Sequence, residues 1–496
     1  MVALAVYALL LAAAGLAIWR RPALLLPLLV VGLAFHNAVM AALFAGGVRG
    51  ADLTAIQAWK EALLGVALAR VAADAVRARR LPFRPGLVDW LALGFAAIVV
   101  LYALLPQGPL EGHAGAKAIA YGLRHDLVPV GAYLVGRSVL LGREELRRFA
   151  WTLLATAAAV GALGIAADYA LSLDWWRDAH VAAYFRDQLG FHYRGPRGLP
   201  ENFVYNTGNE HRLLRRLVSV FLSPLGTSAM LLVALVGAAA GLPFKRRPQL
   251  AGALAAVVAV ALLLTFTRSA LAALALALIV LALLQRRLLP LAGALATIAA
   301  AAVLVAVFPS IAPRDHFTKA ELVVQRENAR KHGGAGNPVL EDPSAHSHLS
   351  SLREGLRTVV HHPQGFGLGN AGQTASRTGT ELKAGESTYT ELGVETGLLG
   401  MLLFIGWMLV LVVRTGRAAL VRQPPWTAAI AAALAAVLAL AVQTDVLGEP
   451  WLAYCVFWLA GSAVSAAAMR PAGAGSPTDP APAVPPASPP AALPPR

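Results

Sequence analysis

Long apolar segments alternate with shorter polar connections along the chain. A helix needs about 20 apolar residues to cross a hydrocarbon core, and most of these segments come close to that length. Within lipid the backbone must satisfy its own hydrogen bonds, so such segments fold as helices. The segments are residues 2–18, 23–45, 55–76, 87–105, 127–141, 149–171, 218–242, 250–264, 269–284, 288–308, 398–413, 427–442 and 451–469. The pattern predicts an all-α polytopic integral membrane protein with about 13 transmembrane helices, and counts of 12 to 14 also fit.

The basic residues predict how these helices are oriented. Clusters of arginine and lysine fall on every second connection, and short basic loops stay in the cytoplasm. The clusters are residues 20–21, 77–84, 137–148, 245–247, 286–287, 414–422 and 470. All seven agree on one frame, in which the N-terminus lies outside the cell and the C-terminus inside.

This frame divides the chain into six parts. Helices at residues 1–171, 218–308 and 398–470 alternate with a first outer segment (172–217) and a large second outer segment (309–397), and a tail (471–496) follows. Both outer segments are basic, which long loops tolerate because they are translocated largely regardless of charge. The tail is rich in proline and alanine without apolar periodicity, so we expect it to be disordered.

Composition excludes a soluble enzyme. Only 14% of the 496 residues are charged and 57% are hydrophobic, whereas soluble domains carry about 25% charged residues. The net charge of +15 fits either an anionic ligand or adhesion to anionic membrane lipids. Cys455 is the single cysteine, so an intrachain disulfide is excluded and the redox compartment stays open.

Arg268 interrupts an apolar stretch of the chain, residues 250–284. The stretch is too long for one span and predicts two helices joined by a tight outer turn at residues 265–269. An ionisable residue near membrane depth is costly and marks a functional site by default. The alternative is an arginine that snorkels from a helix end.

A second group of arginines precedes the span at residues 218–242. Arg212, Arg215 and Arg216 are spaced i, i+3 and i+4, which predicts one shared helix face. Guanidinium groups bind phosphate oxygens in a bidentate manner. The alternative is an interfacial anchor.

The second outer segment carries further candidates. A short amphipathic helix containing Arg353 is expected to end at His361 and His362, before a glycine-rich turn at residues 365–369. This turn is not a dinucleotide fingerprint, because no strand precedes it; its glycines permit a tight turn near a ligand. Glu386, Glu391 and Glu395 lie just outside the next span, where a carboxylate could act as a general base. For Glu391 and Glu395 the alternative is favourable charge at a helix N-terminus.

Paired histidines in the second outer segment could suggest a metal. His346 and His348, and His361 and His362, have no third ligand at a usual spacing. We therefore expect neither a metal nor a cofactor.

These segments resemble the O-antigen ligase and polysaccharide polymerase superfamily of bacterial envelopes. The resemblance rests on LLLTFTRSALAALALALIV (T-x-S-R after a span), HHPQGFGLGN (h-P-x-x-G-x-G), ESTYTELGVETGLLG (H-N-x-y-L-x-x-x-x-E-x-G-l-l-G) and RLVSVFLSP (R-x-x-G-x-f-x-N-P). The four motifs occur in order between residues 212 and 400, and the N-terminal third matches mainly in hydropathy.

The resemblance implies a C-type glycosyltransferase fold in the bacterial cytoplasmic (inner) membrane. Such enzymes transfer a glycan from undecaprenyl diphosphate to a hydroxyl of an acceptor glycan or glycolipid, and a chain-length regulator is a further expected partner; nucleic acid is not. Arg268 and Arg216 match family arginines and would stabilise the diphosphate leaving group, with Arg212, Arg215, Arg353, His361 and His362 as further substrate-binding candidates. Glu386 stands where ligases have a histidine, and Ser387 replaces asparagine. The departure favours a polymerase over a ligase, with Glu386 as the base.

Two other classes stay open at this point. A transporter or flippase would place broken helices near the midplane, often in repeated halves, whereas this chain has no detectable repeat. A sensor or scaffold would bind an outer partner through its loops. Convergence of Arg216, Arg268, Arg353 and Glu386 in one outer cavity would favour the enzyme.

Overall fold

The structure is a computed structural model of the 496-residue chain. It describes residues 2–206, 213–241, 247–323, 326, 343–383, 387–421 and 425–468. Of the predicted features, Arg212, Glu386, the loop at 245–246 and the C-terminal tail lie outside these residues.

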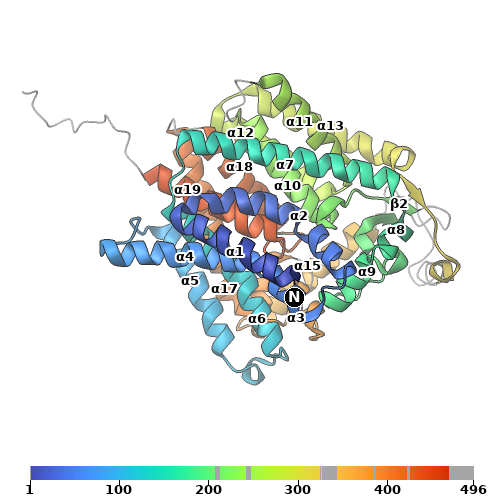
Figure 1. Ribbon diagram of the computed structural model, residues 1–496, viewed down its shortest axis with the longest axis horizontal. Helices are drawn as coiled ribbons and strands as arrows, with labels where there is room; N and C mark the ends of the chain where they lie inside the picture. Colours follow the sequence, from blue (N-terminus) through green and yellow to red (C-terminus); the bar gives the residue numbers. More distant parts are fainter. Residues whose placement is uncertain are drawn as a thin grey trace, which may run out of the picture.

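Helices dominate the described residues, and each predicted apolar segment overlaps at least one of them (Figure 1). These helices are α1 (Val2–Arg20), α2 (Leu25–Ala45), α4 (Trp59–Ala78), α5 (Leu87–Leu104), α6 (Ala116–Ser138), α7 (Arg143–Ala170), α10 (Pro224–Ala239), α11 (Pro248–Leu264), α12 (Arg268–Gln285), α13 (Leu288–Ile311), α17 (Thr388–Leu420), α18 (Pro425–Leu440) and α19 (Phe457–Ala468). Seven of the described helices are long and apolar enough to cross a membrane. The chain is a multi-pass helical membrane protein, and the count of 13 spans stays a prediction.

The bundle has an apolar interior and an apolar exterior. Large side chains such as Trp407, Trp451 and Trp458 are fully buried in its centre. Leu288 and Leu289 of α13 are nevertheless 80% and 77% exposed. A soluble protein rarely exposes a continuous surface of this kind, whereas lipid is as apolar as leucine. The exposed apolar faces therefore fit a membrane environment.

Smaller elements lie in the connections. The short helices are η1 (Pro22–Leu24), α3 (Gly50–Gln57), η2 (Gly108–Leu110), α8 (Leu173–Asp178), α9 (Val181–Ala183), η3 (Tyr184–Gln188), η4 (Pro196–Gly198), η5 (Glu201–Phe203), η6 (Ser219–Phe221), α15 (Pro343–His361), α16 (Gly372–Thr378) and η7 (Leu452–Val456). Three short antiparallel strands form a sheet in the order β1 (Val204–Asn206), β2 (Leu213–Arg215) and β3 (Arg314–Asp315). Within the described ranges the fold is therefore all-α except for this small sheet, which the hydrophobic pattern did not predict.

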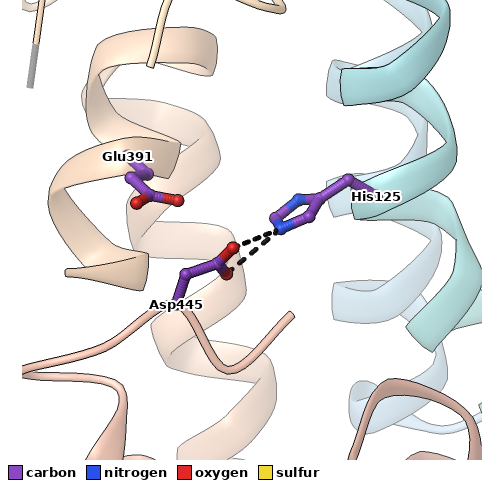
Figure 2. Close-up of side chains that lie close together, drawn as sticks. All are labelled: His125, Glu391 and Asp445. Carbon is purple, nitrogen blue, oxygen red and sulfur yellow. Dashed lines mark hydrogen bonds and ion pairs between the residues drawn. The ribbon is translucent and has the colours of Figure 1, made fainter. Parts of the chain in front are cut away.

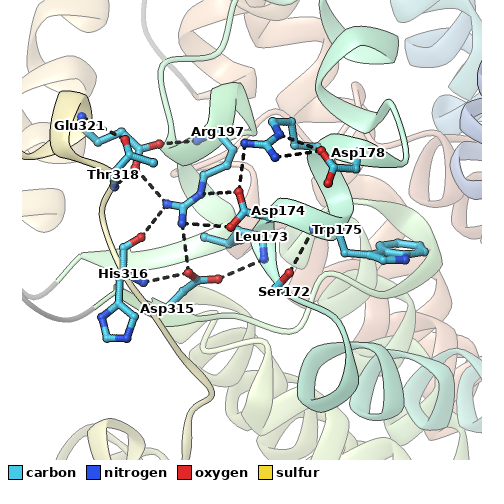
Figure 3. A network of polar contacts seen from close by, with 11 residues as sticks. Ser172, Leu173, Asp174, Trp175, Asp178, Arg197, Asp315, His316, Thr318 and Glu321 are labelled. Carbon is cyan, nitrogen blue, oxygen red and sulfur yellow. Dashed lines mark hydrogen bonds and ion pairs between the residues drawn. The ribbon is translucent and has the colours of Figure 1, made fainter.

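The sheet and an ion-pair network join the two outer segments. Strands β1 and β2 come from the first outer segment and β3 from the second, with Leu213 opposite Asp315. Arg197 contacts Asp174 of its own segment and reaches across to Asp315 at 3.3 Å and Glu321 at 2.9 Å (Figure 3). The two outer segments thus pack against each other, the arrangement expected if both lie on the same side of the membrane.

The predicted inner connections also contact one another. Arg137 donates hydrogen bonds to the buried carboxylate of Asp89 and to the carbonyl of Arg84. Asp89 also accepts hydrogen bonds from the Tyr133 hydroxyl and from the backbone N–H of Gly86. A charged group at this depth needs such partners. These contacts link the ends of α5 and α6 that the charge pattern assigns to the cytoplasm.

Candidate functional site

Arg216 and Arg268, predicted to act together, lie side by side. The chain between α11 and α12 turns at Thr265, Phe266 and Thr267, where the sequence predicts a tight turn. Arg216 donates from Nε to the carbonyl of Thr265 at 2.9 Å and from Nη2 to Oγ1 of Thr267 at 3.1 Å. The next residue, Leu217, donates its backbone N–H to Leu264 at 3.1 Å. Two of the four predicted motifs are therefore hydrogen-bonded to each other.

The charge of Arg216 is held in a partly desolvated place beside a second charge. Burial and the charge of Arg268 lower the pKa of Arg216 to about 10, so it remains protonated at neutral pH. Its Nη1 donates no hydrogen bond to a described residue. Arg268 lies near the rings of Tyr205 and Phe266, with 6.0 Å and 5.8 Å between Cζ and the ring centroids. The arrangement presents two neighbouring guanidinium groups, which suits an anion.

The shared helix face predicted for Arg212, Arg215 and Arg216 is wrong, because residues 213–215 form strand β2 between β1 and β3. Neighbouring residues of an extended chain point in opposite directions. Arg215 therefore points away from Arg216, toward the Asp168 carboxylate at 3.1 Å and the carbonyls of Asp168 and Leu171. Arg212 lies outside the described residues.

A small cleft opens beside these arginines. It is lined by residues of α7, α8 and the segment around η6. Asp168, Trp176, Phe203, Arg215 and Arg216 are among its lining residues. The cleft combines charged and aromatic groups, as a site for a polar ligand requires.

The other two motifs also pack together, and glycines make this contact close. The glycine-rich turn places the N–H of Phe366 2.6 Å from the carbonyl of Val394, and Gly367 and Gly369 donate to the backbone carbonyl and the side chain of Glu395. Gly397 has a φ of +70° and kinks α17 there. A Cβ on Gly365 would lie only 2.5 Å from the nitrogen of Gly397. The predicted turn is confirmed, and its close approach is to α17.

Asn370 ties this turn to the connection between α5 and α6. Its side chain is fully buried. Nδ2 donates to Oε1 of Gln107 at 2.7 Å and to the carbonyl of Gly367, while Oδ1 accepts from the N–H of His113 at 2.8 Å. Two outer connections of the predicted topology thus meet at one residue.

The remaining predicted site residues are more peripheral. Arg353 and His361 are exposed on α15, and Nδ1 of His361 is 2.8 Å from the carbonyl of Arg357. His362 stacks on Phe366, with 3.8 Å between ring centroids. Glu386 lies outside the described residues. The structure therefore brings Arg216 to Arg268 and does not bring Arg353 to either.

A buried cluster lies between α6, α17 and the connection at residues 441–449, and of its members the sequence indicated only Glu391 and Glu395. His125 contacts Oδ1 of Asp126 through Nδ1 at 2.7 Å and the Asp445 carboxylate through Nε2 at 3.0 Å (Figure 2). Glu391 and Glu395 are only 6% and 5% exposed, and the Glu391 carboxylate points toward Asp445. The adjacent His125 and Asp126 at the start of an apolar helix were the available signal.

The connection at 441–449 contacts the start of α17 at one end and approaches the start of α10 at the other. At its start, Ser387 donates to the carbonyl of Ala441 and Thr388 to that of Thr444. At its end, a Cβ on Gly226 would lie 2.7 Å from Oε2 of Glu449. Gly226 belongs to the first turn of α10, a few residues beyond Arg216. This connection therefore lies between the α17 motif and the segment that carries Arg216.

The two carboxylates of this connection, Asp445 and Glu449, have pKa values shifted in opposite directions. Burial raises the pKa of Asp445, but His125 and the backbone N–H groups of Gly448 and Leu447 outweigh it and hold that pKa below the ordinary value. Burial and the charge of Asp445 raise the pKa of Glu449 to about 7. The charge of His125 and the hydrogen bonds thus favour the ionised form of Asp445, whereas desolvation disfavours the ionised form of Glu449.

A second, apolar cleft lies among the helices. It is lined by α7, α10, α18, η7 and α19, with Phe149, Val233, Trp426 and Leu459 among its residues. Helix α7 lines both clefts, through residues 164–168 at the arginines and residues 146–153 here. At 1.5 Å per residue, these stretches are about 20–25 Å apart along the helix.

Comparison with known families supports the resemblance. Residues 251–405 match a family model described as O-antigen ligase. This range contains the Thr265–Arg268 turn, the glycine-rich turn and the α17 motif. No curated protein matches the chain. The match supports the O-antigen ligase and polymerase superfamily and, with it, a glycosyltransferase-type enzyme that acts on lipid-linked oligosaccharide and a glycan acceptor.

Proposed function

We propose that this chain, an O-antigen ligase/polymerase-type glycosyltransferase by its match at residues 251–405, polymerises undecaprenyl-diphosphate-linked oligosaccharide on the outer side of the cytoplasmic membrane. In this proposal Arg216 and Arg268 bind the donor diphosphate. The observation that carries it is the position of these two guanidinium groups, fixed by Thr265, Thr267 and two aromatic rings.

The leaving group explains why two arginines are needed. When the acceptor hydroxyl attacks C1 of the donor sugar, the C1–O bond breaks and negative charge develops on the departing diphosphate. Donors that are already in place stabilise such charge without reorganising. Arg216 has two fixed hydrogen bonds and keeps Nη1 for the ligand. Bound diphosphate would also relieve the repulsion between Arg216 and Arg268. The arginines supply this stabilisation without a metal in the transfer step.

The base in this proposal is Glu386. It precedes α17 in the sequence, and the two residues that follow it, Ser387 and Thr388, are held by the connection at 441–449. It accepts the proton of the acceptor hydroxyl as the new glycosidic bond forms.

The apolar cleft is the proposed place for part of a polyprenyl chain. It shares α7 with the cleft beside Arg216, so a lipid whose diphosphate binds at the arginines can run down this helix. Its lining is almost entirely apolar, as a hydrocarbon tail requires. In this proposal the N-terminus lies outside and the C-terminus in the cytoplasm, as the alternation of the basic connections indicates.

We favour a polymerase because Glu386 and Ser387 replace the His-Asn pair of ligases. The alternative within the family is a ligase that transfers to lipid A core or to a protein acceptor. A flippase is less well supported, since the motifs of this chain gather in outer connections and not at the membrane midplane.

Analysis of lipid-linked oligosaccharides in a deletion strain tests the function. Loss of a polymerase leaves single repeat units on the carrier lipid, whereas loss of a ligase leaves long polymer on the carrier that is not attached to an acceptor. The wild-type gene should restore normal products and an Arg216→Ala gene should not. An unchanged lipid-linked pool in the deletion strain would exclude both activities.

A further inference from the structure

The cluster around His125 has the composition of a metal site. The ligand atoms of His125, Glu391 and Asp445 all lie within 4.8 Å of one another, and they come from α6, α17 and the connection at 441–449 (Figure 2). We propose that these three residues bind a divalent transition-metal ion that holds the three elements together. The site is separate from the histidine pairs of the second outer segment, and the contacts that support it do not depend on the proposed transfer reaction.

The distances suit coordination. Nε2 of His125 lies 3.0 Å and 3.1 Å from the two carboxylate oxygens of Asp445. Nitrogen and oxygen ligands bind such ions at about 2.0–2.2 Å, so two ligand atoms at roughly a right angle are about 3 Å apart. Glu391 would take the third position, since the ligand atoms of all three residues lie within 4.8 Å of one another.

The burial of the Glu391 carboxylate gives further support. Glu391 is only 6% exposed, and its side chain accepts no hydrogen bond from the described part of the chain. It lies against the backbone of Gly372, where a Cβ would be 2.2 Å from its Cδ. A buried carboxylate without a partner is costly. A bound cation would offset that cost.

Neighbouring groups hold the proposed ligands in position. Nδ1 of His125 contacts Oδ1 of Asp126 at 2.7 Å, the carboxylate–histidine pairing that orients metal-bound imidazoles. Asp126 Oδ2 is buried and has no partner among the described residues. Oδ1 of Asp445 also accepts from the N–H groups of Gly448 at 2.8 Å and Leu447 at 3.1 Å. His125 and Asp445 are therefore both held in position before an ion binds.

The charge balance favours a cation. Asp126, Glu391 and Asp445 are buried carboxylates with one imidazole among them. Among the described residues, His125 is the only cationic group within ion-pair distance of any of them. An imidazole with carboxylates selects zinc- or manganese-class ions over calcium, which prefers oxygen ligands throughout.

Metal content and thermal unfolding of the full-length protein in detergent test the proposal. We expect about one equivalent of zinc or manganese by elemental analysis. After chelation, adding Zn²⁺ or Mn²⁺ at about 100 times the dissociation constant should raise the melting temperature by roughly 5 °C. Cys455 is fully buried and is the single cysteine, so a thiol-reactive dye reports unfolding directly.

Variants separate the site from general carboxylate effects. Glu391→Gln and Asp445→Asn should lose the bound ion, and Asp126→Asn should weaken binding about 10- to 100-fold while keeping both ligands. The control is His362→Gln, because His362 stands 3.8 Å from a carboxylate oxygen of Glu111 but outside the cluster. The proposal is overturned if the purified protein holds no metal and neither Zn²⁺ nor Mn²⁺ raises its melting temperature. It is also overturned if Ca²⁺ raises the melting temperature as much as Zn²⁺ or Mn²⁺ does, or if Glu391→Gln binds as much metal as the wild type. These readouts do not use transfer activity, so they stand or fall separately from the proposed function.

Discussion

Replacing Arg216 by lysine tests the diphosphate site most sharply. Arg216 donates from Nε to the Thr265 carbonyl and from Nη2 to the Thr267 hydroxyl, and in the proposal Nη1 binds the diphosphate. Lysine retains the charge but has one nitrogen, which cannot hold both threonine oxygens and a phosphate in the same geometry. We therefore expect Arg216→Lys to lose at least one hydrogen bond to a charged group.

The magnitude follows from that count. A hydrogen bond involving a charged group contributes about 1.5–3 kcal/mol, and about 1.4 kcal/mol corresponds to a tenfold change in rate. The kcat/KM for the lipid-linked donor should fall about 10- to 150-fold in Arg216→Lys, and further in Arg216→Ala. The assay is glycan transfer by the purified protein in liposomes that contain lipid-linked oligosaccharide.

Arg215→Lys is the matched comparison. Arg215 is the adjacent residue in the chain, but its guanidinium is engaged by Asp168 and by two backbone carbonyls. Its replacement should lower the melting temperature and change kcat/KM of the folded protein by less than tenfold. Equal kcat/KM losses in Arg215→Lys and Arg216→Lys, or unchanged transfer in Arg216→Ala, would refute the reasoning.

The remaining predictions concern the second arginine, the base and the outer segments. Arg268→Lys should reduce transfer at a normal protein level in the membrane, as read by immunoblot alongside the assay. Glu386→Gln removes basicity and keeps shape, so it should abolish transfer while donor binding survives; full polymer production would exclude Glu386 as the base. Arg197→Ala leaves the half-buried carboxylates of Asp315 and Glu321 without their arginine, which should appear as a lower melting temperature. In a Cys455→Ser background, single cysteines at Arg186 and His361 should react with a membrane-impermeant reagent from the same side.

The helices were predictable because their signal is local. Apolar length and short basic connections identify spans within windows of about 20 residues. The turn at Thr265–Arg268 followed from one arginine inside an apolar stretch, and the glycine-rich turn from its three glycines. Each of these features is decided by neighbouring residues, so one sequence sufficed.

Features that depend on distant partners were not predictable. The i, i+3 and i+4 spacing of Arg212, Arg215 and Arg216 indicated a helix, but pairing with β3, a hundred residues away, made residues 213–215 a strand. Tertiary context overrides such weak local preferences. His125 and Asp445 are 320 residues apart. Only the packing of α6 against the last outer connection, residues 441–449, brings them together.

The last outer connection links the parts of the proposed site. It lies outside residues 251–405, the range of the family match, yet it binds Ser387 and Thr388 at one end and approaches Gly226 at the other. In the sequence, Ser387 follows the base proposed at Glu386, and Gly226 follows Arg216 by ten residues. The connection at 441–449 therefore contacts chain neighbours of both proposed groups, and the ion proposed at Asp445 would fix it to α6 and α17. Changes in this connection should alter the alignment of donor and acceptor without touching either substrate.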